Sequence, residues 1–345
     1  MTDSTTTAST PPDRTRRAGQ HSAVLAVMGD ALPEDRRPHP GPIAMLPQPV
    51  GAYADAVHAA GGRLSDIDSD TRGIVWTSVT RASELTDTLA ANPQVQWVQL
   101  PFAGVDAFAS ALRDNDRPDL VWTSAKGAYA EPVAEHALAL TLAALRLFPA
   151  RARAASWGES DGRSLYGLNV VIVGAGGIAI ELIRLLEPFR VTVTVVRKSA
   201  GTVPGAHRTV TADRFAEVLP DADVLVLAAA STSDTRHLLG AAQFEAMRSD
   251  AVVVNIARGP LIDTDALVHA LTHGQIAAAG LDVTDPEPLP DGSPLWTLDT
   301  CLITPHTADT PDMITPLLAE RIRVNVEAFL GTGRFVGVVD PSAGY

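Results

Sequence analysis

Short apolar runs rich in valine, isoleucine and leucine alternate with segments of helical pattern along most of this 345-residue chain. This alternation constrains the fold strongly, because strands separated by helices pair in parallel and need helices on both faces of their sheet. The sequence therefore predicts an α/β fold. Strands are expected at residues 23–29, 73–78, 95–101, 120–124, 169–174, 191–196, 223–228, 251–256, 278–283 and 300–304. Helices are expected at residues 51–60, 81–91, 105–113, 177–187, 213–219, 241–247, 264–273 and 311–330.

Residues 131–155 form one continuous Ala- and Leu-rich pattern between the two groups of strands. The high helix propensity of this stretch, with Pro132 suited to a first turn, predicts a single buried helix that links two domains. The six strands that follow match the size of a doubly wound domain.

Charge and cysteine content exclude several classes of function. With 27 Lys and Arg against 40 Asp and Glu, the net charge is −13, so a nucleic-acid partner is not expected. No run reaches the ~18 apolar residues of a membrane span, so no membrane partner is expected either. Residues 1–21 contain no apolar stretch, which predicts a disordered tail rather than a secretory signal. The single cysteine, Cys301, lies in an apolar run and fits a cytoplasmic protein.

A glycine-rich turn, G-A-G-G-I-A at 174–179, lies between a Val-rich run and a helical pattern. Gly174 permits a tight turn, and Gly176 allows the backbone to approach a pyrophosphate. The N–H groups of Gly177 and Ile178, at the start of the helix, are placed to hold phosphates with help from the helix dipole. An ordinary strand-to-helix turn is the alternative, but the context favours a dinucleotide site.

The end of the next strand reads V-V-R-K-S, with Arg197 twenty positions after Gly177. A site that prefers NAD carries an acidic residue there to bind the ribose hydroxyls. Arg197, Lys198 and Ser199 instead suit a 2′-phosphate, so NADP(H) is favoured, with NAD(H) as the alternative cofactor.

Three ionisable side chains follow apolar runs near the C-terminus: Arg258 in N-I-A-R-G, Glu287 in D-P-E-P and His306 in T-P-H. A guanidinium, a carboxylate and an imidazole beside a dinucleotide fold can polarise a carbonyl group and move a proton. The other histidines give weaker evidence of a functional role. His136 is interpreted as structural. His269 and His273 lack a metal-ligating partner, so no metal site is expected.

Several longer stretches match a known pattern. They are L-P-F-A-G-V-D (100–106), V-A-E-H-A (133–137), D-A-V-V-V-N-I-A-R-G-P-L-I-D-T-D-A-L (250–267), A-G-L-D-V-T-D-P-E-P-L-P (279–290), P-L-W (294–296) and L-I-T-P-H-T-A (302–308). With these motifs the chain resembles the D-isomer-specific 2-hydroxyacid dehydrogenases, of the glyoxylate/hydroxypyruvate reductase type, over residues 22 to 335.

The resemblance implies two doubly wound parallel-sheet domains. A Rossmann cofactor domain is expected at residues 126–306, and a discontinuous flavodoxin-like substrate domain at residues 22–125 and 307–335. Residues 336–345 are then a C-terminal tail. Substrate and nicotinamide are expected to meet between the domains, and two chains are expected to form a homodimer.

The resemblance also implies roles for individual residues. Arg258 is expected to bind the substrate carboxylate and carbonyl oxygen, His306 to act as general acid and base, and Glu287 to hold the other ring nitrogen. Ala103 and Gly104 are the expected substrate loop, which acts together with Arg258 and His306. Further cofactor contacts are expected from Ala229, Ala230, Thr235, Ala257, Arg258, Asp282 and His306.

The implied reaction is D-stereospecific hydride transfer between NADP(H), or NAD(H), and C2 of a small 2-oxo or 2-hydroxy acid. A non-catalytic, dinucleotide-sensing protein of the corepressor type keeps a similar polar triad and is the alternative. Formate dehydrogenases carry Gln in place of Glu287, which disfavours that activity. The chain departs from the usual pattern at Ala230, where Pro is common, at Ser293, where His is common, and at Asp309, where Gly is frequent.

Overall fold

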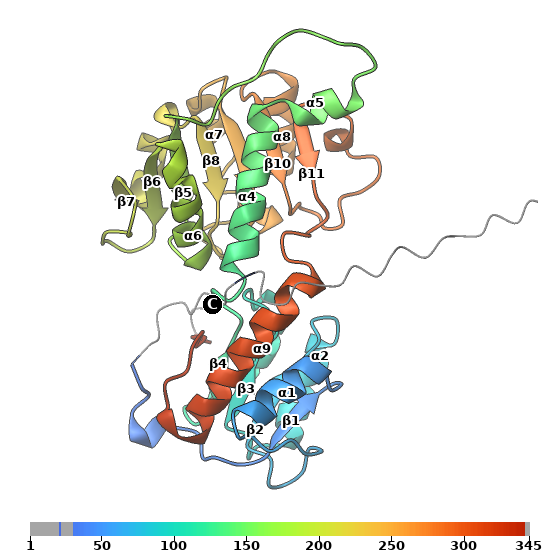
Figure 1. Cartoon of the computed structure of the whole chain (residues 1–345), viewed down its shortest axis with the longest axis vertical. Coiled ribbons are helices and arrows are strands. Elements are labelled where there is room, and N and C mark those ends of the chain that lie inside the picture. The colour runs from blue at the N-terminus through green and yellow to red at the C-terminus, as the bar shows by residue number, and fades with distance from the viewer. Residues whose placement is uncertain (1–20, 22–29, 342–345) are drawn as a thin grey trace, which may run out of the picture.

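The computed structural model describes residue 21 and residues 30–341. The predicted tail, apart from residue 21, and the predicted strand at 23–29 lie outside the described residues, as do residues 342–345. Two lobes, each built on its own parallel sheet, are stacked along the long axis of the molecule (Figure 1). The predicted α/β class with parallel sheets is confirmed.

The larger sheet has seven strands in the order β11-β10-β9-β8-β5-β6-β7 and is parallel throughout. The order reverses between β5 and β8, which is the arrangement of a Rossmann fold and marks its switch point for ligands. Its strands are β5 (Asn169–Val173), β6 (Thr192–Arg197), β7 (Arg208–Thr211), β8 (Val224–Leu227), β9 (Val252–Asn255), β10 (Ala278–Leu281) and β11 (Cys301–Ile303).

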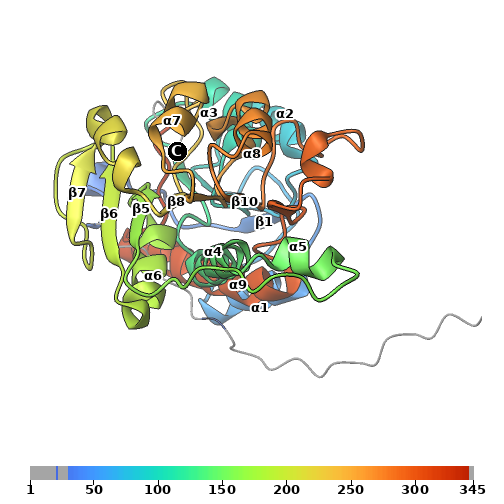
Figure 2. The same ribbon diagram turned by 90° about the horizontal axis from the view of Figure 1, so that it is seen from above.

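Helices cover both faces of this sheet (Figure 2). One layer holds α4 (Ala130–Leu145) and α6 (Gly177–Leu186), and the other holds α7 (Ala241–Ala246) and α8 (Thr264–Thr272). Because both faces are covered, the central strands are apolar on both sides, and Val252, Val253 and Val254 are all buried. We call this part, β5 to β11 with α4 to α8, the large-sheet lobe.

The structure corrects three predicted elements of this lobe. The single helix expected at 131–155 ends at Leu145, because Leu147 adopts a left-handed conformation with φ of 56°, and a short helix α5 (Phe148–Arg153) follows. Strand β7 was not predicted, since its sequence R-T-V-T is short and mostly polar. The helix expected at 213–219 is instead a pair of 3₁₀ turns, η4 (Ala212–Glu217) and η5 (Leu219–Asp221).

The smaller sheet has the order β1-β2-β3-β4, also parallel, with β1 (Ile43–Leu46), β2 (Gly73–Trp76), β3 (Trp97–Gln99) and β4 (Val121–Thr123). Helices α1 (Gly51–Ala59) and α9 (Pro311–Glu327) pack together on one face, and α2 (Ala82–Ala91) and α3 (Ala109–Asp114) on the other. The described strands show no reversal of order. Strand β1 was not predicted, because its four residues are followed at once by Pro47.

The chain returns to the smaller sheet after β11, so this lobe is built from two separate stretches of sequence (Figure 1). We call β1 to β4 with α1, α2, α3 and α9 the small-sheet lobe, and residues 304–310, between β11 and α9, the crossing segment. Residues 336–339, expected to belong to a tail, pack on this lobe. Val336 and Val339 are buried, and Val338 pairs antiparallel with Thr123.

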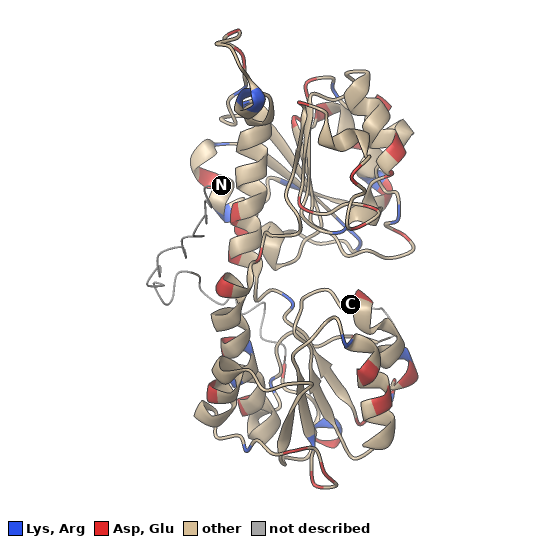
Figure 3. Ribbon diagram, turned by 90° about the vertical axis from the view of Figure 1, so that its right-hand side faces the viewer, with Lys and Arg blue, Asp and Glu red and all other residues tan. Residues whose placement is uncertain are grey.

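Acidic and basic residues are interspersed along the ribbons of both lobes (Figure 3). The sequence has 40 Asp and Glu against 27 Lys and Arg. Within residues 30–341, none of the helices combines the length and the apolar character that crossing a membrane requires.

Candidate active site

The carboxyl ends of β9, β10 and β11 meet at one edge of the large sheet, because these three strands are parallel neighbours. Arg258 follows β9, Asp282 and Glu287 follow β10, and His306 follows β11. Residues up to 48 positions apart in sequence are thereby brought to the same edge, where ligands bind in open α/β sheets.

His306 and Glu287 form a close pair, with 2.7 Å between Nδ1 of the imidazole and Oε1 of the carboxylate. This contact assigns the proton to Nδ1 and leaves Nε2 free to face a ligand. His306 has φ of 52°, a left-handed conformation that is uncommon outside glycine and often found at functional sites. Its backbone N–H, which donates to the carbonyl oxygen of Asp282 at 2.8 Å, helps to hold this conformation.

Asp282 holds the crossing segment in place through hydrogen bonds to its carboxylate. Its buried carboxylate accepts hydrogen bonds from Thr304 Oγ1 at 2.6 Å, from the N–H of Thr307 at 2.9 Å and from the N–H of Ala308 at 3.1 Å. Burial raises the pKa of Asp282, but the hydrogen bonds from His136, Thr304 and the two amides outweigh it, so the net pKa is lowered. An ionised carboxylate therefore fixes the backbone on either side of His306.

His136 belongs to this framework as well. Its Nε2 lies 2.9 Å from Thr304 Oγ1 and 3.4 Å from Asp282 Oδ1, although it sits on α4. These contacts fit the structural role predicted for His136, and they also support the segment that carries His306. The apolar pattern of α4 did not predict the contact between His136 and Asp282, which are 146 positions apart in the sequence.

Arg258 joins the two lobes. Its Nε donates to Asp106 Oδ2 at 3.1 Å, and its Nη1 donates to the carbonyl oxygen of Ala257 at 2.7 Å. Gly104, in the loop after β3, packs so closely that an added Cβ would lie 1.6 Å from Nη2 of Arg258. The predicted substrate-loop residues Ala103 and Gly104 are therefore on the chain segment that meets Arg258. Asp106 was not predicted as a site residue, although it ends the L-P-F-A-G-V-D motif.

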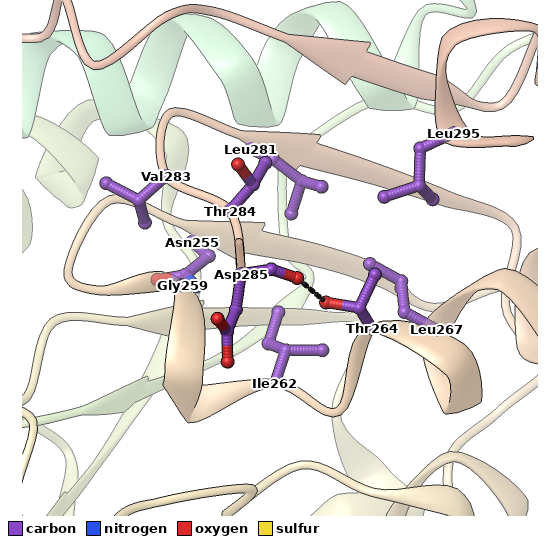
Figure 4. A pocket seen from close by; sticks show the side chains of 10 residues that line it. All are labelled: Asn255, Gly259, Ile262, Thr264, Leu267, Leu281, Val283, Thr284, Asp285 and Leu295. Carbon is purple, nitrogen blue, oxygen red and sulfur yellow. Dashed lines mark hydrogen bonds between the residues drawn. The ribbon is translucent and has the colours of Figure 1, made fainter. Parts of the chain in front are cut away.

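Gly259, directly after Arg258, packs against the loop of Thr284 and Asp285, which leads to Glu287 (Figure 4). A Cβ on Gly259 would lie 1.9 Å from the carbonyl oxygen of Thr284, so this position requires glycine. Thr264 Oγ1 donates to the carbonyl oxygen of Asp285 at 2.6 Å in the same small pocket. The two strand ends therefore hold their functional side chains in a fixed relation.

The glycine-rich turn lies at the same sheet edge, next to the point where strand order reverses. Gly174 has φ of 112°, which favours glycine. Gly176 is the N-cap of α6, no side chain caps this helix, and no acidic residue lies in its first turn. A Cβ on Gly176 would meet nothing within 4 Å, so the backbone there is open to a ligand. The N–H groups of Gly177 and Ile178 at this terminus therefore fit the pyrophosphate of a dinucleotide.

Arg197 is the last residue of β6, the strand beside β5. Its Nη2 donates to Ser199 Oγ at 3.1 Å, while Lys198 Nζ lies 3.4 Å from Asp234 Oδ2. The N–H of Gly174 donates to the carbonyl oxygen of Val196 at 2.8 Å, so the end of β6, directly before Arg197, lies beside the glycine-rich turn.

The remaining predicted contacts lie in loops at this edge. Ala229 and Ala230 follow β8, and Thr235 Oγ1 donates to the carbonyl oxygen of Ala230 at 2.8 Å, which folds the loop back. Ala257 follows β9 and is buried, with its N–H bound to Asn255 Oδ1 at 3.1 Å.

Other polar clusters offer less chemistry. Over the described residues, no three His, Cys, Asp or Glu side chains gather as ligands for a metal. His269 and His273 stack with ring centroids 4.0 Å apart. Burial raises the pKa of the Cys301 thiol to about 12, which makes it an inert core residue.

Comparison with known proteins agrees with this geometry. The family model described as D-isomer specific 2-hydroxyacid dehydrogenase, NAD binding domain, matches residues 137–308. An uncharacterized protein from the proB 3′ region of Corynebacterium melassecola is 41% identical over 257 residues, 73% of this chain and 84% of that protein. Glyoxylate/hydroxypyruvate reductase B of an Enterobacter species is 32% identical over 274 residues, 75% of this chain and 78% of the reductase.

A solved structure is similar over both lobes. It is the D-isomer specific 2-hydroxyacid dehydrogenase from Xanthobacter autotrophicus Py2 in complex with NADPH and MES. The two chains align with a TM-score of 0.76 and 25% identity, over 89% of this chain and 100% of the other.

Proposed function

The chain belongs to the D-isomer specific 2-hydroxyacid dehydrogenase family, as its motifs predicted, and from this premise we propose that it reduces a small 2-oxo acid to the D-2-hydroxy acid, with NADPH as the preferred donor. It is an NAD(P)-dependent oxidoreductase of 2-oxo and 2-hydroxy acids. The observation that carries the proposal is the His306–Glu287 pair, held at the same sheet edge as Arg258 and the glycine turn.

The proposed roles follow from the donors that each residue offers. Arg258 binds the carboxylate and the C2 oxygen of the substrate through its guanidinium fork, which also stabilises negative charge on that oxygen. The backbone N–H groups of Ala103 and Gly104 hold the same carboxylate from the small-sheet lobe.

His306 supplies the proton. Its imidazolium gives the Nε2 proton to the C2 oxygen during reduction and takes it back during oxidation. The Glu287 carboxylate, bound at Nδ1, stabilises the charged ring and fixes its orientation. The nicotinamide, when bound, exchanges a hydride with C2.

A panel assay tests the proposal. Absorbance at 340 nm is followed with glyoxylate, hydroxypyruvate and pyruvate, each with NADPH and with NADH, and oxidation is measured with D- and L-2-hydroxy acids. Turnover of 2-oxo acids, with oxidation of the D enantiomers alone, is expected. Cofactor binding without turnover on any acid would overturn the proposal in favour of a sensing protein.

The preference for NADPH is attributed to Arg197, Lys198 and Ser199, which supply two cations and a hydroxyl group and no acidic acceptor. We predict that Arg197→Asp lowers kcat/KM for NADPH relative to NADH by about tenfold to a hundredfold, the range expected for one charge-assisted hydrogen bond. The exposed Arg208→Asp, which makes the same charge change on the next strand, serves as the matched control. An unchanged ratio in Arg197→Asp would assign the preference to other residues.

We further propose that two chains form a homodimer through the segment that contains α5 and Trp157. Trp157 is 98% exposed and Phe148 is 58% exposed, and large exposed aromatic side chains are typical of interfaces. Sedimentation is expected to give twice the 36.2 kDa mass of the chain. The Trp157→Ser variant should raise the dimer dissociation constant by about thirtyfold, as for a central aromatic contact. A monomeric wild-type protein would contradict this assignment.

A further inference from the structure

His136 reaches the crossing segment from the helix that links the two lobes. It lies on α4, which begins where the lobes meet and runs along the large-sheet lobe (Figure 1). Its side chain is 23% exposed, and its Nε2 contacts both Thr304 Oγ1, at 2.9 Å, and Asp282 Oδ1, at 3.4 Å. The roles proposed above for the reaction give this imidazole no part.

The hydroxyl group of Thr304 decides the direction of its contact with His136. A hydroxyl group has a single proton, and that of Thr304 is donated to the Asp282 carboxylate at 2.6 Å. Its oxygen is therefore an acceptor toward His136, so Nε2 of the imidazole carries a hydrogen. This N–H faces the hydroxyl oxygen and, at the longer distance, the carboxylate itself.

The carboxylate of Asp282 depends on such donors because it is buried. Its side chain is 1% exposed, and an ionised carboxylate in that position is unfavourable without hydrogen bonds and opposite charge. Among the residues whose structure is described, no lysine or arginine pairs with it, and His136 is the one basic side chain within 4 Å. Burial raises the pKa of the Asp282 carboxyl group, and the hydrogen bond from His136 is the largest of the influences that lower it.

The ionised Asp282 carboxylate in turn holds the backbone around His306. It accepts hydrogen bonds from the N–H groups of Thr307 and Ala308, the two residues directly after the proposed proton donor. It also binds the side chain of Thr304, two residues before that donor. A hydrogen-bond donor on α4 thus acts on the position of His306 through this carboxylate.

The same helix is tied to the proposed substrate loop. The hydroxyl group of Tyr129, the N-cap residue of α4, donates to the carbonyl oxygen of Pro101 at 2.6 Å, two residues before Ala103. Tyr129 and His136 are seven residues apart, which is two turns on one side of a helix and about 10 Å along its axis. Helix α4 packs on β9, β10 and β11. It therefore connects the substrate loop to the segment of the proton donor.

We propose that His136 is a positioning residue for the reduction: its Nε2–H binds Thr304 and Asp282 from α4 and so fixes the backbone of His306 relative to the substrate loop. The inference rests on the proposed reduction of 2-oxo acids, and it adds a residue of the linking helix to the groups on which that reaction depends. Misplacing a reacting group by about 1 Å lowers a rate by about a hundredfold, so such a contact affects turnover from a distance.

A purely structural role is the competing explanation, in which His136 contributes only to the stability of α4 on its sheet. Loss of stability lowers the melting temperature but leaves kcat per folded molecule unchanged. A positioning role lowers kcat itself, while KM for the acid stays near the wild-type value because Arg258 still binds the substrate. An N–H donor placed near the position of Nε2 then restores turnover.

The experiment measures kcat and KM for glyoxylate and hydroxypyruvate with NADPH in the full chain, well below the melting temperature of each variant. His136→Ala removes the donor, and His136→Gln returns an N–H near the position of Nε2. Thr141→Val is the matched control on the same helix. It removes a buried side-chain hydrogen bond, to the carbonyl oxygen of Ala137 at 2.8 Å, that does not reach the crossing segment.

In His136→Ala, kcat is expected to fall by about 10- to 100-fold, with KM for the acids within about threefold of the wild type. His136→Gln should recover most of the loss, and Thr141→Val should match the wild type in kcat. His136→Asn, whose amide is one carbon shorter than that of glutamine, should behave like His136→Ala and replaces it if the alanine variant does not fold.

A double-mutant cycle tests whether His136 acts through Thr304. Thr304→Val alone should lower kcat, because it removes the hydroxyl group that joins the imidazole to the carboxylate. Adding His136→Ala to Thr304→Val should then lower kcat by a much smaller factor than His136→Ala does alone, because the two residues belong to one network. Independent, multiplied effects would contradict the proposed connection.

Hydrogen exchange gives a readout that needs no turnover. Exchange of the Thr307 and Ala308 amides, followed by mass spectrometry of peptides that cover residues 304–310, is expected to be about tenfold faster in His136→Ala and unchanged in Thr141→Val. A wild-type kcat in His136→Ala, or a loss that His136→Gln does not reduce, overturns this inference alone. A wild type that reduces neither acid overturns the proposed function, whereas faster exchange in His136→Ala would still support the positioning of the segment by His136.

Discussion

Replacing His306 by alanine is expected to lower kcat for 2-oxo acid reduction by about 10²- to 10⁴-fold, the range for loss of a positioned general acid. The imidazole is the proposed proton donor, and Glu287 contacts its Nδ1 at 2.7 Å. No other imidazole in the described part of the chain shares the crossing segment. Steady-state kinetics at saturating substrate measure the effect.

The fold should tolerate this change. The His306 side chain is 44% exposed, so its truncation leaves no buried cavity. Cofactor affinity, measured by fluorescence titration with NADPH, is expected to remain within a few-fold of the wild type. His58→Ala, on the exposed side of α1, controls for the loss of an imidazole elsewhere. A His306→Ala enzyme with kcat close to the wild type would assign the proton to another donor.

The sequence predicted the large-sheet lobe well because its strands are valine-rich and buried on both faces. Residues 169–174 and 251–256, for example, are rich in valine, which favours a central strand of a parallel sheet that is buried on both faces. The elements that failed are those with weak local signals. Strand β7 is held at the sheet edge only by pairing with β6, and the break at Leu147 depends on a left-handed residue within a pattern of high helix propensity.

Convergence of Arg258, Glu287 and His306 could be expected from sequence, since each follows a strand and parallel neighbours end at one edge. Contacts between the two lobes could not be predicted from the sequence. Asp106 meets Arg258 across 152 positions, and no local pattern encodes that distance. The half-burial of Asp309, directly before the N-cap of α9, is likewise not encoded by the pattern of its own segment.

Replacing Arg258 by alanine is expected to lower kcat/KM for 2-oxo acids by about 10²- to 10⁴-fold. Two charge-assisted hydrogen bonds to the substrate would be lost, each contributing about 1.5–3 kcal/mol. The guanidinium is already preorganised by Asp106 at 3.1 Å and by the carbonyl oxygen of Ala257 at 2.7 Å, so little ordering accompanies substrate binding.

Two further variants separate the charge of Arg258 from its geometry. Arg258→Lys keeps one positive charge but lacks the planar fork, so it should recover only part of the lost kcat/KM. Arg113→Ala, an exposed arginine of α3 paired with Asp114, should leave kcat/KM unchanged. Loss of Arg258 should raise KM as well as lower kcat, because the carboxylate is bound in both the ground state and the transition state. If KM for the acids stays at the wild-type value in Arg258→Ala, the substrate carboxylate is held by the small-sheet loop alone.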